Sequence, residues 1–224
     1  MIVSPVLIIG CARSGTTLLY NVLAEVDALW SIGYESKAII ERDHSPAARG
    51  WESGALLAAD LTADGRERLL RAFDSAAAPG SYWRRVNRLR GALNRTRAYA
   101  GLKQRGRAGD GAAAAVPGAG LGLLRAAARL RRRLLPRAQP IRLLEKTPEN
   151  CLRLPFLQAL FPDARVLFLV RDGRANVHSL LEGWRQPHLF PGYHTPLPVT
   201  SPGQSRGRWA FTLIPGWREL VDRP

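Results

Sequence analysis

The sequence predicts an α/β fold in which helices cover both faces of a short, mainly parallel sheet. Twice along the chain an apolar run of strand length leads into a glycine-containing turn and then into residues with helical spacing, at 6–26 and at 164–184. A third apolar run, 141–144, is interrupted by one arginine and is soon followed by Lys146. Successive strand, turn and helix units are typical of parallel sheets, because each parallel strand needs a crossover before the next. With 224 residues, 46% of them hydrophobic, the chain is expected to form a single domain spanning 1–224.

The first strand is expected to end in an anion-binding loop. Residues 6–9 are apolar, and residues 10–17 have the glycine spacing of a Walker A loop. In that loop a lysine follows the second glycine and reaches the outer phosphates of a nucleoside triphosphate, whereas here Thr16 follows Gly15. Unsatisfied backbone N–H groups at the helix start, together with Arg13, still favour a phosphate-like group; the alternative is a tight connection without a ligand. The helix after the loop is expected to present one apolar face, made of Leu19, Val22, Leu23 and Val26.

A second strand and helix meet at a cluster of basic residues. Residues 164–170 are mostly β-branched, aromatic or otherwise apolar, which predicts a strand buried on both faces, as suits a central parallel sheet. The chain then turns at Arg171 and Gly173 into a helix over 175–184. Ligands of open α/β sheets bind beyond the carboxyl ends of the strands, so Arg171, Arg174 and Ser179 are expected near that edge. A guanidinium and a hydroxyl suit a second phosphate, and the alternative is that the charges simply solvate a strand end.

Together the two motifs resemble the sulfotransferases that use 3′-phosphoadenylyl sulfate (PAPS), most closely the branch containing the tyrosylprotein sulfotransferases. The resemblance covers roughly residues 3–36 and 142–184 and implies a three-layer, P-loop-like sulfotransferase fold. Family members continue with another strand and a segment that closes over the adenine, so the resemblance also implies a fold that is incomplete at its C-terminus, Pro224. The matching stretches follow the family's order along the chain: 13–18, 33–37, 145–148 and 170–179.

The resemblance implies a role for each matched position. Lys146 would steady the sulfuryl group and the departing phosphate, and Glu35 would take the proton of the acceptor. With Arg13, these two are the expected catalytic residues. The 3′-phosphate would be held by Arg171 and Ser179. The 5′-phosphosulfate would be held by Arg13 and by the backbone of Ser14, Gly15, Thr16 and Thr17.

The function that the resemblance implies is in-line transfer of a sulfuryl group from PAPS to a hydroxyl. An alcohol or phenol attacking sulfur needs a carboxylate to take its proton, and cations stabilise the charge that accumulates on the leaving oxygens. The scheme requires no metal, and the four histidines show no spacing typical of metal ligands. Small molecules, glycans, lipids and peptide tyrosines all remain open as acceptors.

The positive charge of the chain is concentrated in one segment. The formal net charge is +15, and residues 81–140 hold 15 Lys and Arg against a single acid, Asp110. We expect a basic Ala/Gly/Arg-rich helical excursion at about 75–140, with a basic amphipathic helix at 121–135. That helix is interpreted as a solvated face packed on the sheet, or alternatively as a contact for an anionic membrane surface, nucleic acid or an acidic substrate.

The expected location is the cytoplasm. There are two cysteines, Cys11 and Cys151, so no disulfide framework is evident and a reducing compartment is the simpler expectation. The apolar N-terminal run is too short for a signal peptide, and no apolar stretch is long enough to span a bilayer.

Two other functions remain open at this point. One is a P-loop kinase or nucleotide phosphotransferase, which is disfavoured by Thr16 and by the lack of a clear magnesium-holding acid at a strand end. The other is a nucleic-acid-binding module that uses the arginines of 81–140, which is disfavoured because few aromatic residues are interleaved with them.

Overall fold

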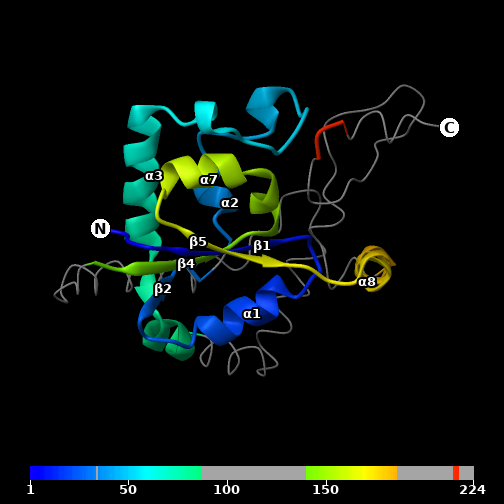
Figure 1. Ribbon diagram of the computed structural model, residues 1–224, viewed down its shortest axis with the longest axis horizontal. Helices are drawn as coiled ribbons and strands as arrows, with labels where there is room; N and C mark the ends of the chain where they lie inside the picture. The colour runs from blue at the N-terminus through cyan, green and yellow to red at the C-terminus, as the bar shows by residue number, and fades with distance from the viewer. Residues whose placement is uncertain (34, 87–139, 186–213, 217–224) are drawn as a thin grey trace, which may run out of the picture.

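One mainly parallel sheet forms the centre of the molecule. The structure is a computed structural model that describes residues 1–33, 35–86, 140–185 and 214–216. In these ranges five strands pair in the order β3-β2-β4-β1-β5 (Figure 1). Four of them run parallel, and β3 pairs antiparallel with β2 at one edge. The strands are β1 (Val6–Gly10), β2 (Leu29–Ser31), β3 (Ala78–Pro79), β4 (Arg142–Lys146) and β5 (Arg165–Leu169).

Helices lie on both sides of this sheet. Figure 1 shows α1 on one face and α2, α3 and α7 on the other, with α8 beyond the end of β5. The predicted three-layer α/β fold with a short, mainly parallel sheet is therefore confirmed. The helices of the described ranges are α1 (Thr16–Leu23), α2 (Lys37–Ile40), α3 (Ala63–Ala76), α7 (Leu154–Leu160) and α8 (Gly173–Arg185), with 3₁₀ turns η1 (Ala47–Arg49), η2 (Ala58–Asp60) and η3 (Pro148–Leu152).

The core consists of two apolar layers with β1 between them. All five residues of β1 are buried, because the strand runs between β4 and β5. Successive side chains of a strand point to opposite faces. Leu7 therefore packs with Leu143 and Phe73 on the side of α3, whereas Ile8 packs with Tyr20 on the side of α1. Apolar side chains therefore pack against β1 on both faces of the sheet.

Helix α3 lies within residues 60–78, where Leu61, Leu69, Leu70 and Phe73 occur among charged residues in a pattern compatible with one helix. Thr62 caps it, since the Gly65 amide donates to the Thr62 hydroxyl at 3.1 Å. Leu69 and Phe73, one turn apart, are fully buried against the sheet. The amphipathic spacing in the sequence was therefore sufficient to find this element.

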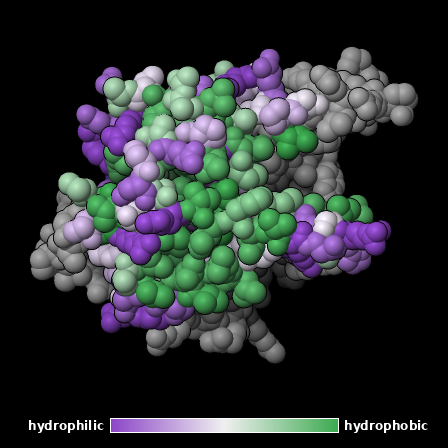
Figure 2. Space-filling model, viewed as in Figure 1, coloured by the Kyte–Doolittle hydropathy of each residue, from purple (hydrophilic) through white to green (hydrophobic). Residues whose placement is uncertain are grey.

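β5, which was expected to be buried on both faces, is largely exposed and lies at the edge of the sheet in the described ranges, so that expectation is wrong there. β5 pairs with β1 alone, and Phe168 is 65% exposed. Figure 2 shows hydrophobic residues gathered on the face formed by β5 and α1. An apolar run indicates a strand suited to burial, but the neighbours of that strand decide whether it is buried.

Two of the four residues predicted to form the apolar face of α1 pack against the core. Leu19 and Leu23 pack against the core, but Val22 is 60% exposed. Tyr20 is buried instead, because its hydroxyl bonds with Ser31 at the end of β2. Val26, just after the helix, is also exposed. The hydrogen bond of the Tyr20 hydroxyl therefore determines which side of this short helix faces the core.

The topology brings the loops of interest to one edge of the sheet. The four parallel strands all end on the same side, and each is followed by one of the matched stretches, after Gly10, Ser31, Lys146 and Leu169. The chain leaves β1 through α1 on one face and returns from β4 to β5 through α7 on the other. Connections that diverge in this way open a crevice at the strand ends, where α/β proteins bind ligands.

Most of the basic excursion expected at 75–140 lies outside the described ranges, and so does the helix expected at 121–135. Within the described ranges, no helix has both the length and the apolar character needed to cross a membrane.

Gly10 is expected to be irreplaceable in this fold. A Cβ on Gly10 would lie 2.5 Å from the carbonyl oxygen of Leu169, and its φ of 154° is unfavourable for other residues. We expect Gly10→Ala to lower the free energy of unfolding by about 3 kcal/mol, measured by urea denaturation.

Gly50→Ala is the matched control for that prediction. Gly50 also has a positive φ, 66°, but nothing lies within 4 Å of its added Cβ, so only the backbone strain of about 1 kcal/mol applies. Equal losses of unfolding free energy in the Gly10 and Gly50 variants would show that the close approach of position 10 to Leu169 does not affect stability.

Candidate active site

The loop between β1 and α1 contains residues with strained, positive φ angles. Arg13 has a positive φ of 69°, and Gly15 adopts the left-handed conformation that starts α1. The Ser14 amide donates to the Cys11 carbonyl at 3.1 Å and closes the turn. Ser14 is buried, and its hydroxyl has no hydrogen-bond partner among the described residues. A buried hydroxyl without a partner at a helix N-terminus that carries no acidic side chain fits a bound anion.

Asn176 fastens the start of α8 to this loop. Its side-chain amide donates to the Ala12 carbonyl at 3.1 Å, and its oxygen accepts from the Cys11 thiol at 3.3 Å. Asn176 is 7% exposed. Sequence analysis gave this residue no role, although it lies inside the matched stretch 170–179, and that position was the signal that could have found it.

The predicted phosphate-binding residues lie together. Arg13 donates from Nε to the Ser179 hydroxyl at 3.1 Å, and Arg171 donates from Nη1 to the Arg13 carbonyl at 2.9 Å. These residues are more than 150 positions apart in the sequence. Their contact brings two guanidinium groups and a hydroxyl to the edge of the loop, which is a set of donors suited to phosphate or sulfate.

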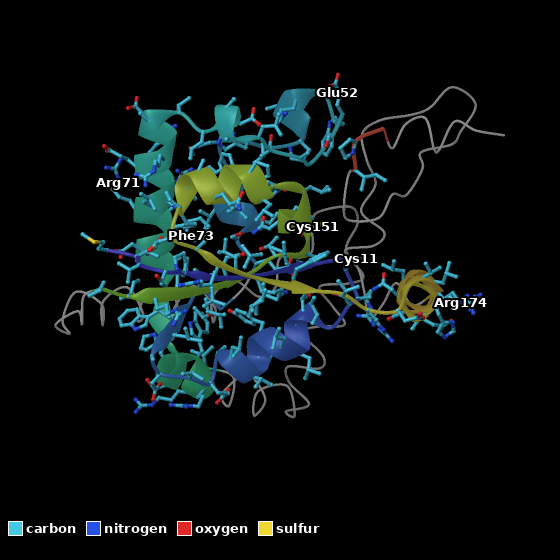
Figure 3. The ribbon with its side chains drawn as sticks, in the orientation of Figure 1. Cys11, Glu52, Arg71, Phe73, Cys151 and Arg174 are labelled. Atoms are coloured by element: carbon cyan, nitrogen blue, oxygen red, sulfur yellow. The ribbon has the colours of Figure 1, made fainter. Side chains whose placement is uncertain are left out.

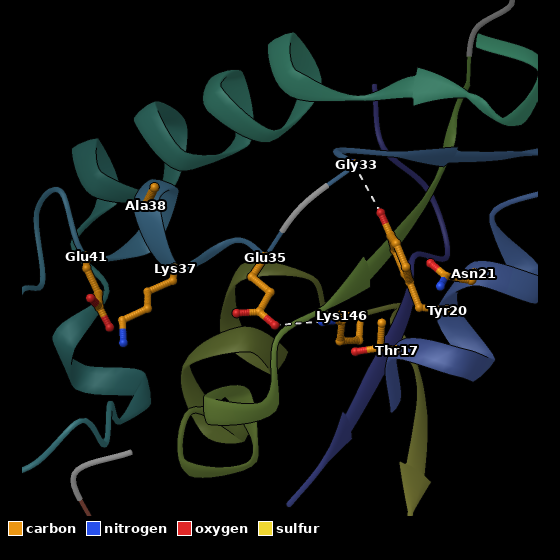
Figure 4. Close-up of a pocket in the computed structure, with 9 residues that line it drawn as sticks. All are labelled: Thr17, Tyr20, Asn21, Gly33, Glu35, Lys37, Ala38, Glu41 and Lys146. Carbon is orange, nitrogen blue, oxygen red and sulfur yellow. Dashed lines mark hydrogen bonds and ion pairs between the residues drawn. The ribbon is translucent and has the colours of Figure 1, made fainter. Parts of the chain in front are cut away.

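Glu35 and Lys146 form an ion pair beside the loop. Lys146 Nζ lies 2.6 Å from Glu35 Oε1, where β4 ends against the segment between β2 and α2 (Figure 4). The Lys146 side chain is 8% exposed and that of Glu35 is 31% exposed. Lys146 Nζ also lies 5.9 Å from the centre of the Tyr20 ring, within the range of a cation–π contact. A carboxylate and an ammonium are thus held at the crevice before any substrate arrives.

A pocket opens where this ion pair meets the start of α1. Its volume is about 720 Å³, within the range of small-molecule sites. Among the described residues, no group of three or more His, Cys, Asp or Glu side chains is placed to hold a metal ion. The pocket is lined by Thr17, Tyr20, Asn21, Gly33, Glu35, Lys37, Ala38, Glu41 and Lys146 (Figure 4).

Comparison with protein families shows to which family this chain belongs. The family model described as the sulfotransferase family matches residues 5–190, which include all four stretches of the sequence motifs. This chain belongs to the sulfotransferase family. Proteins of this family transfer sulfuryl groups, so the chain is a transferase. No curated protein matches the chain significantly.

A buried polar network lies behind the ion pair of this sulfotransferase. Its members are fully buried and come from three segments. Burial raises the pKa of the Glu145 carboxyl, and hydrogen bonds from Thr147, Ser36 and Asn150 oppose that shift. Glu145 and Lys146 are adjacent in β4, so their side chains point to opposite faces of the sheet. The members of the network are Ser36, Glu145, Thr147 and Asn150.

Two further ion pairs support the pocket wall of the sulfotransferase. Lys37 Nζ lies 3.1 Å from Glu149 Oε1, and burial raises the pKa of Glu149 while the Lys37 charge lowers it. Arg153 Nη2 lies 2.5 Å from Glu41 Oε1, and Arg153 Nε donates to the Gly54 carbonyl at 2.9 Å. Arg153 is 1% exposed. Nothing in the sequence distinguished this arginine, since basic residues at helix starts are usually exposed.

Arg153→Met is expected to destabilise the sulfotransferase strongly. The change leaves Glu41 without the Arg153 cation and the buried Gly54 carbonyl without its donor. We expect a loss of about 3 kcal/mol in the free energy of unfolding, measured by urea denaturation.

The matched control is Arg71→Met on α3. Arg71 pairs with Glu67 at 3.1 Å, but both side chains are about 70% exposed, and Figure 3 shows Arg71 on the outer side of α3. Its loss should leave the unfolding transition nearly unchanged. Similar transitions for the Arg153 and Arg71 variants would refute the structural role of Arg153.

Proposed function

We propose that this chain transfers the sulfuryl group of PAPS to a hydroxyl acceptor by in-line displacement. The supporting observation is the Glu35–Lys146 ion pair, held at the strand ends beside a loop that presents an unpartnered buried hydroxyl. In the reaction the bond between sulfur and the bridging phosphate oxygen breaks, and a bond between sulfur and the acceptor oxygen forms. The acceptor proton goes to Glu35, and adenosine 3′,5′-bisphosphate leaves.

The donor site is proposed to consist of the loop and the start of α8. Arg13 and the backbone amides from Ser14 to Thr17 would hold the 5′-phosphosulfate, at the positive end of α1. Arg171 and Ser179 would hold the 3′-phosphate. The hydrogen bond between Arg13 and Ser179 supports this division, because it joins the two halves of the donor site. The buried Ser14 hydroxyl supplies one more donor.

Lys146 and Glu35 are proposed to act on the reacting oxygens. Glu35 accepts the acceptor's proton as general base, and Lys146 stabilises the negative charge that accumulates on the leaving phosphate. With Arg13, they are the proposed catalytic residues. Because the charges are in place before substrate binds, little reorganisation is needed when charge develops.

The acceptor is proposed to enter the pocket beside Glu35. Small molecules, glycans, lipids and peptide tyrosines are the candidate classes, the last being the substrate implied by resemblance to the tyrosylprotein branch. We propose that donor and acceptor sites belong to one domain spanning residues 1–224.

Binding of adenosine 3′,5′-bisphosphate tests the donor assignment. We expect calorimetry to show binding to the wild-type chain and at least tenfold weaker binding to Arg13→Ala, because a guanidinium on a phosphate contributes a charge-assisted hydrogen bond, about 1.5–3 kcal/mol. Arg71→Ala, far from the loop, is the control and should bind normally. Binding of ATP in place of the bisphosphate would overturn the assignment.

Turnover with PAPS and a panel of hydroxyl acceptors tests the catalytic roles. Lys146→Ala should lower kcat on the order of 10²-fold or more through lost charge stabilisation. Glu35→Gln should lower kcat by a similar factor, on the order of 10²-fold, while affinity for the bisphosphate stays near the wild-type value, since the base touches the acceptor. A wild-type kcat in either folded variant would remove the role assigned to that residue.

A further inference from the structure

We propose that Thr147 is a positioning residue, which holds Glu35 within reach of Lys146 through a network centred on the buried carboxyl of Glu145. Thr147 touches neither of the two charged groups itself. This inference rests on the proposed function, because it explains how the base and the cation of that reaction are kept together.

Thr147 joins the two chain segments that carry the ion pair. Its hydroxyl accepts a hydrogen bond of 2.8 Å from the backbone amide of Ser36 and lies 3.1 Å from the Ser36 hydroxyl. Ser36 follows Glu35 directly, and Thr147 follows Lys146 directly. The bond therefore links the peptide group next to the base with the residue next to the cation, across 111 positions of sequence.

The other end of the Glu35 segment is also tied down. The Gly33 amide donates to the Tyr20 hydroxyl at 3.1 Å and to the Ser31 hydroxyl at 2.8 Å. Glu35 thus lies between two anchored residues. Gly33 is bonded to side chains of α1 and β2, and Ser36 is bonded to Thr147. The latter bond ties Ser36 to the residue directly after Lys146.

Glu145 and Asn150 hold the Thr147 hydroxyl in its orientation. Thr147 Oγ1 donates to Glu145 Oε1 at 2.6 Å, and Asn150 Nδ2 donates to Glu145 Oε2 at 3.0 Å. Asn150 Nδ2 also lies 3.3 Å from the Ser36 hydroxyl. Side chains of β4, η3 and the segment before α2 therefore meet in one network, whose four residues are each 0% exposed.

Stability alone does not account for these residues. Burying polar groups is costly unless they are paired, and apolar residues of similar volume usually stabilise a core as well or better. Thr147 precedes η3 at the position of a helix cap, yet its side chain caps nothing there. Its hydroxyl is used to connect Ser36 with Glu145, which is what a positioning role requires.

The test replaces Thr147 by valine, which keeps the shape and removes the hydroxyl. We expect kcat for sulfuryl transfer to fall about 10²-fold, since displacement of a catalytic group by about 1 Å has effects of that size. Affinity for adenosine 3′,5′-bisphosphate should change by less than about twofold, because the donor loop is held by α8 instead. Thr147→Ser restores the hydroxyl and should restore most of kcat.

Hydrogen exchange provides a readout that does not depend on turnover. The Ser36 amide should be protected in the wild-type chain, exchange rapidly in Thr147→Val, and be protected again in Thr147→Ser. If the wild-type chain transfers no sulfuryl group, the proposed function fails, while exchange at Ser36 still decides whether the network exists.

Thr62→Val is the matched control. Thr62 also accepts a backbone amide, that of Gly65 at 3.1 Å, but it caps α3 on the surface. The Thr62→Val variant should lose some stability and keep the wild-type kcat. Should Thr147→Val fail to fold, Ser36→Ala removes one hydroxyl of the network and should lower kcat about tenfold with unchanged bisphosphate affinity.

Three results would overturn the positioning role. The first is a folded Thr147→Val with wild-type kcat, or, if it does not fold, a Ser36→Ala variant with wild-type kcat. The second is a loss of kcat that Thr147→Ser does not restore. The third is an equal loss of kcat in Thr62→Val, which would attribute the effect to stability.

Discussion

The parallel pairing of β1 with β4 and β5 is the constraint on which the rest of this structure depends. It sets Ile8 opposite Lys146 and Gly10 opposite Leu169, so the segments that follow all three strands start at nearly the same level. Because β1 is buried on both faces, its register is fixed by packing as well as by hydrogen bonds. A one-residue slip would turn Lys146 away from α1 and separate it from Tyr20.

The site combines groups that are held in different ways. The loop between β1 and α1 is fixed mainly through the backbone carbonyls of Ala12 and Arg13, which accept bonds from Asn176 on α8 and from Arg171 just before α8. The segment that carries Glu35, by contrast, is fixed by a side-chain hydroxyl, because the Ser36 amide donates to Thr147. The first arrangement leaves the Ser14 hydroxyl available for an anion, and the second fixes the position of the Glu35 carboxylate. Electrostatic catalysis depends on donors and charges that are already in place when charge develops on the reacting atoms.

Buried charge is concentrated below the pocket. Glu145, Glu149 and Arg153 are all less than 3% exposed, whereas most charged residues in the described part of the chain are not buried. Such groups cost desolvation energy that apolar residues would avoid. Each has hydrogen-bonding or charged partners that line or approach the pocket, so stability is given up here in favour of a defined geometry.

The sequence by itself determined the fold class, the family resemblance and the residues at the strand ends, because strand–turn–helix units and their glycine and basic residues are local patterns. It did not place β5 at an edge or rotate α1 onto Tyr20, because both depend on neighbours distant in the chain. It did not assign supporting roles to Asn176, Thr147 or Arg153, although the first two lie inside matched stretches, because the partners that give them those roles lie about 100 positions or more away. Only the tertiary structure decided which polar groups meet, and burial then made those contacts matter, because a buried polar group has no water to replace its partner.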